Sequence, residues 1–473
     1  MKKCYLLLTA LLLALGVSAQ DKGEDYFAIG ELDRARKMLE SRTDGNLAET
    51  NYYLGEIACI QGDRAKAKTC YDKGLALDPA YPLNEVGLAK LLLKDNKAAA
   101  VKILTVAAKK NKKDPEVLTA IAKAYYDNGM TAEGDETLDA AESAGGKSAL
   151  PNLLRGDRLM AANNPGAAAG EYEQALMKEP DNVPVGIKIS QIYMRIDPNI
   201  AIERLRELES RTGNNPLVEK YLARSCFGAG RYDEAIQLYT TIYDPAKQDI
   251  DVITCYAASL FFTEQYDQAS KLTQQGLTLD PNNFVLTRLC MYSELSKKDY
   301  AAALAIAEKF FALGSAEYLG RPLAALTYGD LLLQNDRVDE AVAQYNKALE
   351  VPETAPATIH QIADNLNRKY PEAAADYYRK YIDALGEQAQ ATDYYTMGQS
   401  YYKSAAALTR DTVSVDAPVR LARCLDRADE AFAVVSERIP QSHLGPIFQA
   451  RVNSLRDPEA TAGLAKPYYE KVV

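Results

Sequence analysis

The segment Ala141–Ser148 comes closest in this chain to a nucleotide-binding motif. It ends in Gly146-Lys147-Ser148, like a phosphate-binding loop, but carries Ala141 in place of the first glycine. Such a loop must follow a β-strand and open a helix, so that backbone N–H groups converge on the phosphates. Here the segment follows a predicted helix over 131–142, at a turn where glycine is favoured as a C-cap. We therefore predict a turn between helices, and no cofactor.

Histidine supplies many metal ligands and general bases in proteins, and this chain has only two, His360 and His443. Neither has a partner at ligand spacing in the sequence. The patterns His-Glu-x-x-His, Cys-x-x-Cys and Gly-x-Ser-x-Gly do not occur in it. We predict no catalytic residues and no metal site, and hence a protein that is not an enzyme.

The first 19 residues have the features of a secretory signal peptide. Met1-Lys2-Lys3 is positively charged, an apolar run over 5–17 follows, and Val17-Ser18-Ala19 forms a small-residue cleavage site. The apolar run is shorter than the ~20 residues that span a membrane. We expect residues 1–19 to be removed, the mature chain to be exported to the periplasm or cell envelope, and no transmembrane segment to remain.

Six cysteines follow the predicted cleavage site: Cys59, Cys70, Cys226, Cys255, Cys290 and Cys424. An even number in an oxidising compartment permits disulfides. They are scattered singly, mostly along apolar helical stretches, which favours buried thiols. Whether any of them pair stays open.

The charge balance bears on the class of partner. The 473 residues include 55 Lys and Arg against 65 Asp and Glu, a formal net charge of −10. Proteins that neutralise phosphates need a basic patch or stripe. The composition therefore disfavours nucleic acid and anionic lipid as partners.

A 34-residue period organises the chain. Ala235, Ala269 and Ala303 lie 34 residues apart, and a tyrosine precedes each by three residues. An aromatic residue also follows many such alanines by four positions, in the pairs Ala67/Tyr71, Ala168/Tyr172, Ala235/Tyr239, Ala341/Tyr345, Ala373/Tyr377, Ala428/Phe432 and Ala465/Tyr469. This spacing puts both residues on one helix face. The alanine lets a partner helix approach, and the ring fills the space beside the contact.

These features resemble the tetratricopeptide repeat, a pair of antiparallel helices closed by a proline. The stretch Tyr52–Pro79 is close to a full repeat, although the chain lacks the tryptophan that the repeat often carries. The resemblance covers nearly the whole chain after the signal peptide. It implies an all-α fold, namely a right-handed superhelical solenoid of antiparallel helix pairs, with about 12–13 pairs over 20–473.

The predicted array has an insertion near 404–420. Polar and β-branched residues over Thr409–Pro418 indicate a loop, followed by an extended helix from Val419 to about Arg438. Insertions in repeat proteins map to loops, often on the binding face.

The last unit, 443–473, is predicted to be incomplete, because the sequence ends soon after its aromatic residue. Solenoids need polar terminal units for solubility. We expect an uncovered apolar edge formed by Leu464, Tyr468 and Val472, which further polypeptide or self-association would cover.

The resemblance also implies where a partner binds, because the first helices of such repeats line a concave groove. Counting outward positions from the small residue of each first helix gives a stripe that includes Glu56, Lys123, Asp157, Met160, Gln191 and Met194. Its centre groups cations with aromatic residues: Lys220, Arg224, Phe227, Phe261, Arg288 and Tyr292. Such a group suggests a pocket for an acidic or C-terminal peptide segment. The apolar members could instead pack between adjacent repeats.

The favoured function is a non-enzymatic protein–protein interaction scaffold of the cell envelope, which binds a peptide segment or partner domain in the groove. The alternative is a glycan-binding or nutrient-uptake accessory protein of the envelope. Proteins of that kind resemble lipid-anchored proteins with tryptophan-rich platforms, and this chain has no tryptophan.

Overall fold

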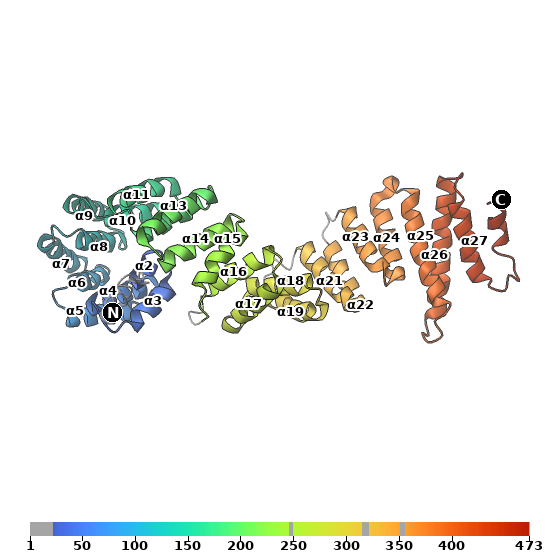
Figure 1. The fold of residues 1–473 in the computed structure, drawn as a ribbon, viewed down its shortest axis with the longest axis horizontal. Coiled ribbons are helices and arrows are strands. Elements are labelled where there is room, and N and C mark those ends of the chain that lie inside the picture. Colours follow the sequence, from blue (N-terminus) through green and yellow to red (C-terminus); the bar gives the residue numbers. More distant parts are fainter. Residues whose placement is uncertain (1–21, 246–248, 315–320, 351–354, 473) are drawn as a thin grey trace, which may run out of the picture. The chain divides into compact units, whose positions relative to one another are not determined.

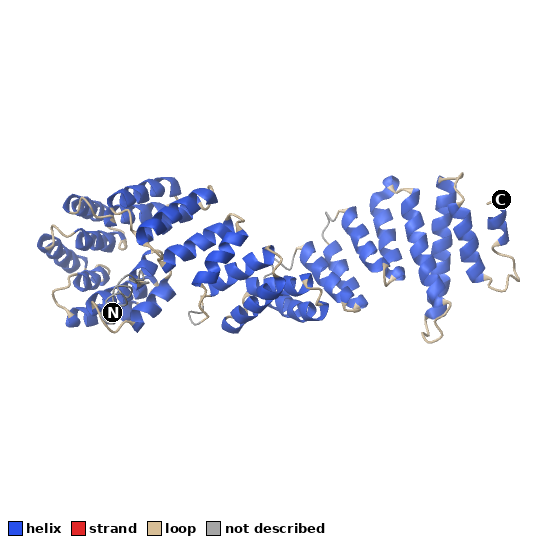
Figure 2. Ribbon diagram, in the orientation of Figure 1, coloured by secondary structure: helices blue, strands red, loops and turns tan. Residues whose placement is uncertain are grey.

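The computed structural model describes residues 22–245, 249–314, 321–350 and 355–472. Within these ranges all regular secondary structure is helical and no strand occurs (Figure 2), which confirms the all-α prediction. The predicted signal peptide, residues 1–19, lies outside them. No helix in the described ranges is both long and apolar enough to cross a lipid bilayer.

The chain divides into two compact units, Met1–Gln265 and Tyr266–Val473. In the first unit each helix packs against the next one along the chain (Figure 1). Its helices are α2 (Gly23–Ala28), α3 (Leu32–Ser41), α4 (Leu47–Ile60), α5 (Arg64–Leu77), α6 (Leu83–Leu92), α7 (Lys97–Lys110), α8 (Pro115–Tyr126), α9 (Thr131–Ala144), α10 (Leu150–Ala161), α11 (Pro165–Lys178), α12 (Val183–Tyr193), α13 (Pro198–Thr212), α14 (Pro216–Gly228), α15 (Tyr232–Ile242) and α16 (Ile250–Phe262).

The second unit continues the same pattern of helix pairs. Its helices are α17 (Tyr266–Leu279), α18 (Phe284–Ser296), α19 (Tyr300–Leu313), α21 (Pro322–Gln334), α22 (Val338–Leu349), α23 (Pro356–Asn367), α24 (Pro371–Leu385), the 3-10 turn η1 (Gly386–Gln388), α25 (Ala391–Leu408), α26 (Ala417–Arg438), α27 (Leu444–Arg456) and α28 (Lys466–Glu470).

Short polar turns start the second helix of many pairs. The side chain of Asp63 accepts a hydrogen bond from the N–H of Lys66 at 2.9 Å, and Asn96 and Asn164 cap their helices in the same way. These caps satisfy N–H groups that have no partner inside the helix. Gly62, just before the Asp63 cap, has φ 78, a left-handed conformation that glycine adopts without strain.

A small residue of the first helix faces an aromatic ring of the second. A Cβ atom added at Gly55 would lie 2.3 Å from the Tyr71 ring, and one at Gly156 would lie 2.4 Å from the Tyr172 ring. Most of the predicted seam pairs are accordingly buried: Ala67/Tyr71, Ala168/Tyr172, Ala235/Tyr239, Ala341/Tyr345 and Ala428/Phe432. Ala269 and Ala303 are also fully buried. The predicted period therefore sets the helix contacts.

The structure corrects two of the predicted seam pairs. In α24 the buried seam pair is Ala374 and Tyr378, whereas Ala373 is only half-buried. The Tyr378 hydroxyl donates a hydrogen bond to Asp364 of α23, which shows that the register lies one residue later than predicted. At the other pair, Tyr469 is 47% exposed, because α28 begins only at Lys466 and is too short to present a packed face.

The hairpin of α2 and α3, here called the N-terminal hairpin, returns to contact helices far along the chain (Figure 1). In α14, Lys220 donates hydrogen bonds to both carboxylate oxygens of Glu31 at 3.0 Å, and the Tyr221 hydroxyl donates to the same carboxylate. Arg34 of α3 pairs with Asp249 at the start of α16. The hairpin also shares a hydrophobic core with α12, α14 and α15. These contacts close the first unit on itself.

The predicted insertion forms a loop over 409–416 between α25 and α26, the longest helices of the second unit. In Figure 1 this loop extends past the ends of the neighbouring helices α24 and α27. Its Val413 and Val415 side chains are 89% and 99% exposed. The extended second helix ends at Arg438, as predicted, and starts at Ala417.

Candidate functional site

A groove of about 790 Å³ lies in the first unit, over the first helices α10, α12 and α14. The turn of the N-terminal hairpin contributes Ile29 to one side of it. Its other lining residues include Asp157, Met160, Tyr172, Lys188, Gln191, Met194, Arg195, Ile196, Tyr221 and Arg224. Five of these belong to the stripe predicted from the sequence: Asp157, Met160, Gln191, Met194 and Arg224.

The walls of this groove are partly apolar and flexible. Met160 and Ile196 are exposed, the latter by 71%, and Met194 is half-buried. Methionine is unbranched and polarisable, so methionine-bearing surfaces adapt to differently shaped apolar partners. The groove therefore offers adaptable apolar contacts rather than one rigid pocket.

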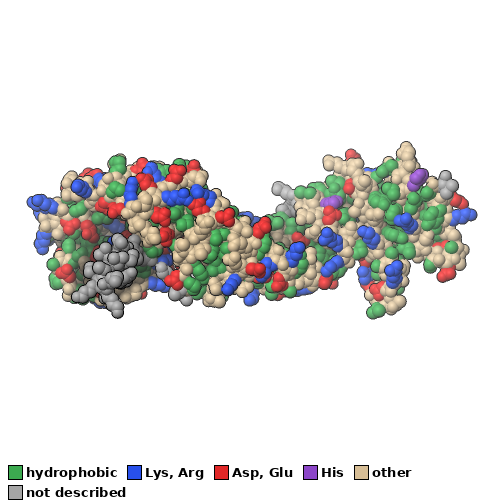
Figure 3. All heavy atoms as spheres, viewed as in Figure 1, with side chains coloured by type: hydrophobic (Ala, Val, Ile, Leu, Met, Phe, Trp, Pro, Cys, Tyr) green, Lys and Arg blue, Asp and Glu red, His purple; other side chains and the backbone are tan. Residues whose placement is uncertain are grey.

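Cationic groups at the groove differ in how they are paired. Arg195 is exposed and its guanidinium forms no ion pair with a described residue, whereas Arg224 pairs with Asp251 at 3.1 Å. Lys188 is bound to Asp157 at 2.5 Å. On the outer face over α11 and α13, acidic and basic side chains intermingle (Figure 3), as in the pair of Arg204 with Glu173. Arg195 thus carries an available positive charge into the groove.

The same hydrogen-bond network recurs in several repeats, and the first-helix carboxylates at its centre are here called floor positions. A carboxylate of the first helix accepts a hydrogen bond from the seam tyrosine 15 residues later: Glu56 from Tyr71 at 2.7 Å, Asp157 from Tyr172 at 2.7 Å, and Asp330 from Tyr345 at 2.6 Å. The next repeat supplies a second donor to each carboxylate: Lys90, Lys188 and Asn365, respectively. Asp157 and Tyr172 both line the groove, so at this position the network connects the helix contact to the groove.

Glu56 is the most buried carboxylate of this network. Both of its oxygens contact Lys90, at 2.8 and 2.9 Å, and Lys123 lies at 3.1 Å. Burial opposes its charge, but Lys90 and Lys123 lower the pKa of the Glu56 carboxyl to about 2. Asp127 pairs with both lysines from the open side.

Lys220, one of the predicted site residues, binds the N-terminal hairpin through Glu31. Its side chain is only 7% exposed and contacts Glu31 at 3.0 Å and Asp249 at 3.2 Å. Burial alone would raise the pKa of Asp249. The charges of Lys220 and Arg34 together have the larger, opposite effect, so the pKa lies below its ordinary value. The Lys220 charge is thus balanced inside the unit.

The other predicted residues of the first unit are placed differently. Arg224 lines the groove. Phe227 is half-buried beside the Tyr232 ring at 5.9 Å, and Phe261 lies beside the Phe262 ring at 5.6 Å. Phe227 of α14 thus contacts α15 within one helix pair, and the role of both phenylalanines in partner binding stays a prediction.

Arg288 and Tyr292 lie on α18 of the second unit. Both are half-buried, and Tyr292 packs against the hydrophobic core of that unit. Their role in partner binding stays a prediction.

Sequence counting missed Lys90, Lys188 and Arg195. Lys90 lies 34 residues after Glu56, so the period itself carried the signal. Lys188 lies three residues before Gln191 on α12, within one turn of the counted position. Arg195 follows the last counted residue of that helix, and no periodic signal marks it.

The structure settles the nature of two other sequence features. Ala141–Ser148 spans the end of α9 and the turn before α10, and a helix rather than a strand precedes it, as expected. The six cysteines that follow residue 19 are free thiols, of which Cys226, Cys290 and Cys424 are buried.

Comparisons with known proteins agree with this architecture. A tetratricopeptide repeat family model matches residues 22–281, more than half of the chain, and a second one matches residues 324–354. No curated protein matches the chain.

Three solved structures show the range of similarity to this chain. The C-terminal part of a TPR repeat-containing protein from Cytophaga hutchinsonii is 24% identical over 46% of this chain and 77% of that chain, with a TM-score of 0.31. A tetratricopeptide repeat protein from Parabacteroides merdae is 13% identical over 63% and 100%, with a TM-score of 0.33. PilF of Pseudomonas aeruginosa is 16% identical over 49% and 96%, with a TM-score of 0.35.

The family match covers every helix of the first unit, where the seam and the groove occur together. The chain therefore belongs to the tetratricopeptide repeat family.

Proposed function

We propose that this protein is a non-enzymatic interaction scaffold of the cell envelope that holds a peptide segment or partner domain in the groove of its first unit. The observation that carries the proposal is the groove over α10, α12 and α14, with adaptable apolar walls and the available charge of Arg195. Membership of the tetratricopeptide repeat family supports a protein partner.

The chemistry of the groove defines the partner segment. Met160, Met194 and Ile196 accept apolar side chains, and Arg195 attracts a carboxylate. Arg224 can exchange its exposed pairing with Asp251 for a ligand carboxylate, because half-exposed ion pairs are weak. We expect a segment in which acidic residues alternate with apolar ones.

Selection of a displayed random peptide library on the purified protein tests this proposal. Selected peptides should be enriched in acidic and apolar residues, and Arg195→Glu should weaken their binding at least about tenfold. Lys147→Glu is the matched control, since Lys147 is an exposed cation outside the groove. Equal binding by both variants, or enrichment of basic peptides, would contradict the proposal.

The envelope location rests on the sequence of residues 1–19. Expression in a Gram-negative host should yield an exported protein whose first residue is Gln20, as read by N-terminal sequencing. Recovery of the protein in the cytoplasm with Met1 retained would oppose this part of the proposal.

The final helix supports a second mode of contact. Leu464 and Tyr469 are exposed and Tyr468 is half-buried, which leaves apolar surface at this edge. We expect self-association through this edge, detected by light scattering and reduced by Leu464→Glu with Tyr469→Glu. A wild-type protein that stays monomeric at every concentration would speak against it.

A further inference from the structure

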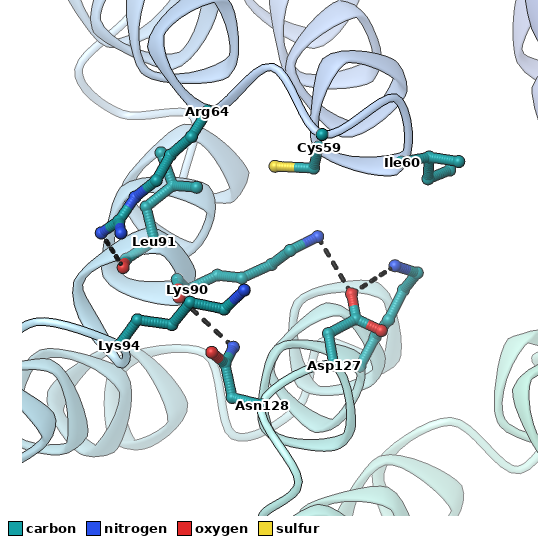
Figure 4. Close-up of a pocket in the computed structure, with 10 residues that line it drawn as sticks. Cys59, Ile60, Arg64, Lys90, Leu91, Lys94, Asp127 and Asn128 are labelled. Atoms are coloured by element: carbon teal, nitrogen blue, oxygen red, sulfur yellow. Dashed lines mark hydrogen bonds and ion pairs between the residues drawn. The ribbon is translucent and has the colours of Figure 1, made fainter.

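A second, smaller cavity of the first unit lies over α4, α6 and α8. It has a volume of about 350 Å³, on the scale of one amino-acid residue or sugar ring. Figure 4 shows Lys90, Lys94 and Asn128 around one space, with the Cys59 sulfur facing them from α4. Lys123 of the predicted stripe also lines this pocket, whereas Lys94 and Asn128 belong neither to the stripe nor to the groove over α10, α12 and α14.

Four cations line this pocket, and three of them are already paired. Lys90 and Lys123 share the carboxylates of Glu56 and Asp127, and Arg64 pairs with Asp95. Lys94 differs, because its ammonium group forms no ion pair or hydrogen bond with any residue in the described ranges. On a chain of net charge −10, the pocket therefore keeps one available positive charge beside a paired cationic wall.

The pocket also contains an unused acceptor. The Asn128 amide nitrogen donates to the carbonyl oxygens of Ala124 at 2.9 Å and Lys90 at 3.3 Å, which fixes the orientation of the amide. Its Oδ1 atom is buried and has no hydrogen-bond partner among the described residues. A buried acceptor left without a donor costs free energy, so a ligand that brings an N–H or O–H group is favoured.

The remaining wall is apolar. Ile60 is exposed by 54%, and Leu91 and Cys59 are half-buried beside the cations. This surface can cover the carbon skeleton of a small ligand.

We propose that this pocket binds a carboxylate that carries a neighbouring N–H or O–H donor. The ligand carboxylate accepts a hydrogen bond from the Lys94 ammonium group, and the ligand N–H or O–H donates one to Asn128 Oδ1. The carbon skeleton of the ligand lies against Ile60 and Leu91. The C-terminal residue of a peptide and a sugar acid both have this chemistry. The proposal does not depend on the groove, because the two cavities share no lining residue.

Ligand-observed saturation-transfer NMR at constant ionic strength tests the proposal with small probes. N-acetylglycine and glucuronate represent the peptide and the sugar source. Acetate has the charge without the donor, N-acetylglycinamide has the donor without the charge, and inorganic phosphate is a general anion. At least one of the first two should bind about tenfold or more tightly than the other three. Binding of N-acetylglycine alone would identify a peptide source, and binding of glucuronate alone a sugar acid.

Two charge-reversed variants complete the experiment. Lys94→Glu should abolish binding of the favoured probe, whereas Lys102→Glu, an exposed lysine of α7 outside the pocket, should leave it unchanged. Both lysines are exposed, so neither change should disturb folding, which circular dichroism can confirm. Equal binding of acetate or phosphate, or unchanged binding by the Lys94→Glu variant, would overturn the proposal. Peptide selection on the groove would remain informative in either case, because Arg195 is not part of this pocket.

Discussion

Glu56 and Asp330 have the same relation to their seam tyrosines, yet their pKa values shift in opposite directions. Burial raises the pKa of both carboxyl groups. At Glu56 the charges of Lys90 and Lys123 outweigh burial. At Asp330 the donors are the neutral side chains of Tyr345 and Asn365, so burial prevails and the pKa stays above its ordinary value. At these two floor positions the partner from the next repeat therefore sets the direction of the pKa shift.

This difference gives the first unit a defined acid sensitivity. Because the pKa of Glu56 falls from 4.5 to about 2 on folding, its stabilisation is complete above pH 4.5 and is lost as the pH falls toward 2. The stability advantage of the wild type over Glu56→Gln should be about 3 kcal/mol at neutral pH and shrink across this window. Urea unfolding at several pH values measures it, and a difference that does not vary with pH would refute the assignment.

Part of this residue-level picture was predictable from the sequence. Counting from the small residues placed Glu56, Lys123 and Asp157 on the groove-lining stripe. Counting could not show that Lys220 is buried, because its partner Glu31 is 189 residues away in the sequence. A contact over such a distance depends on how the repeats curve, which no local pattern records.

At the scale of helices, the seam explains why glycine occurs at some positions and is dispensable at others. Gly156 of α10 lies against the Tyr172 ring, whereas a Cβ atom at Gly170 of α11 would meet nothing within 4 Å. Both residues belong to the same helix pair, so they form a matched test of the seam.

The two glycine-to-alanine changes should have opposite effects. Gly156→Ala should lower the free energy of unfolding by about 1–3 kcal/mol through overpacking. Gly170→Ala should raise it by about 0.5–1 kcal/mol, because alanine favours the helix interior. Chemical denaturation measures both values. Changes of the same sign would show that the seam register is wrong.

A substitution at Lys220 tests the long-range contact between the N-terminal hairpin and α14. Lys220→Met would leave Glu31, Asp249 and Asp251 close together without their shared cation. Breaking a buried ion pair in this way costs about 3–5 kcal/mol. Hydrogen exchange should therefore accelerate strongly over α2 and α3, while α7 keeps its protection. Unchanged exchange in the hairpin would mean that this ion pair does not hold it.

The sequence predicted which helices pair more accurately than it predicted where each helix begins and ends. The 34-residue period and the alanine–aromatic spacing located the helix pairs because they record contacts between neighbours. The one-residue register difference at Ala374 and the exposed Tyr469 arise where local helix starts differ from the average repeat. Average spacing cannot detect such local differences.

At the scale of the whole molecule, the repeats form two compact units in which each helix pair packs mainly on its neighbours. Such arrays derive their stability from successive interfaces and leave extended surfaces for partners. The groove of the first unit, with available charge at Arg195 and apolar walls, is the surface that best fits a protein segment.

Site-specific photo-crosslinking in cell-envelope extract tests this central claim most directly. A photoreactive residue replaces Gln191, which is exposed in the groove, or Gln174, which is exposed on α11 outside it. We predict that position 191 captures a discrete protein, that a peptide selected on the groove prevents its capture, and that position 174 captures none. Equal capture at both positions, or capture at 191 that the peptide does not affect, would contradict a partner segment in the groove.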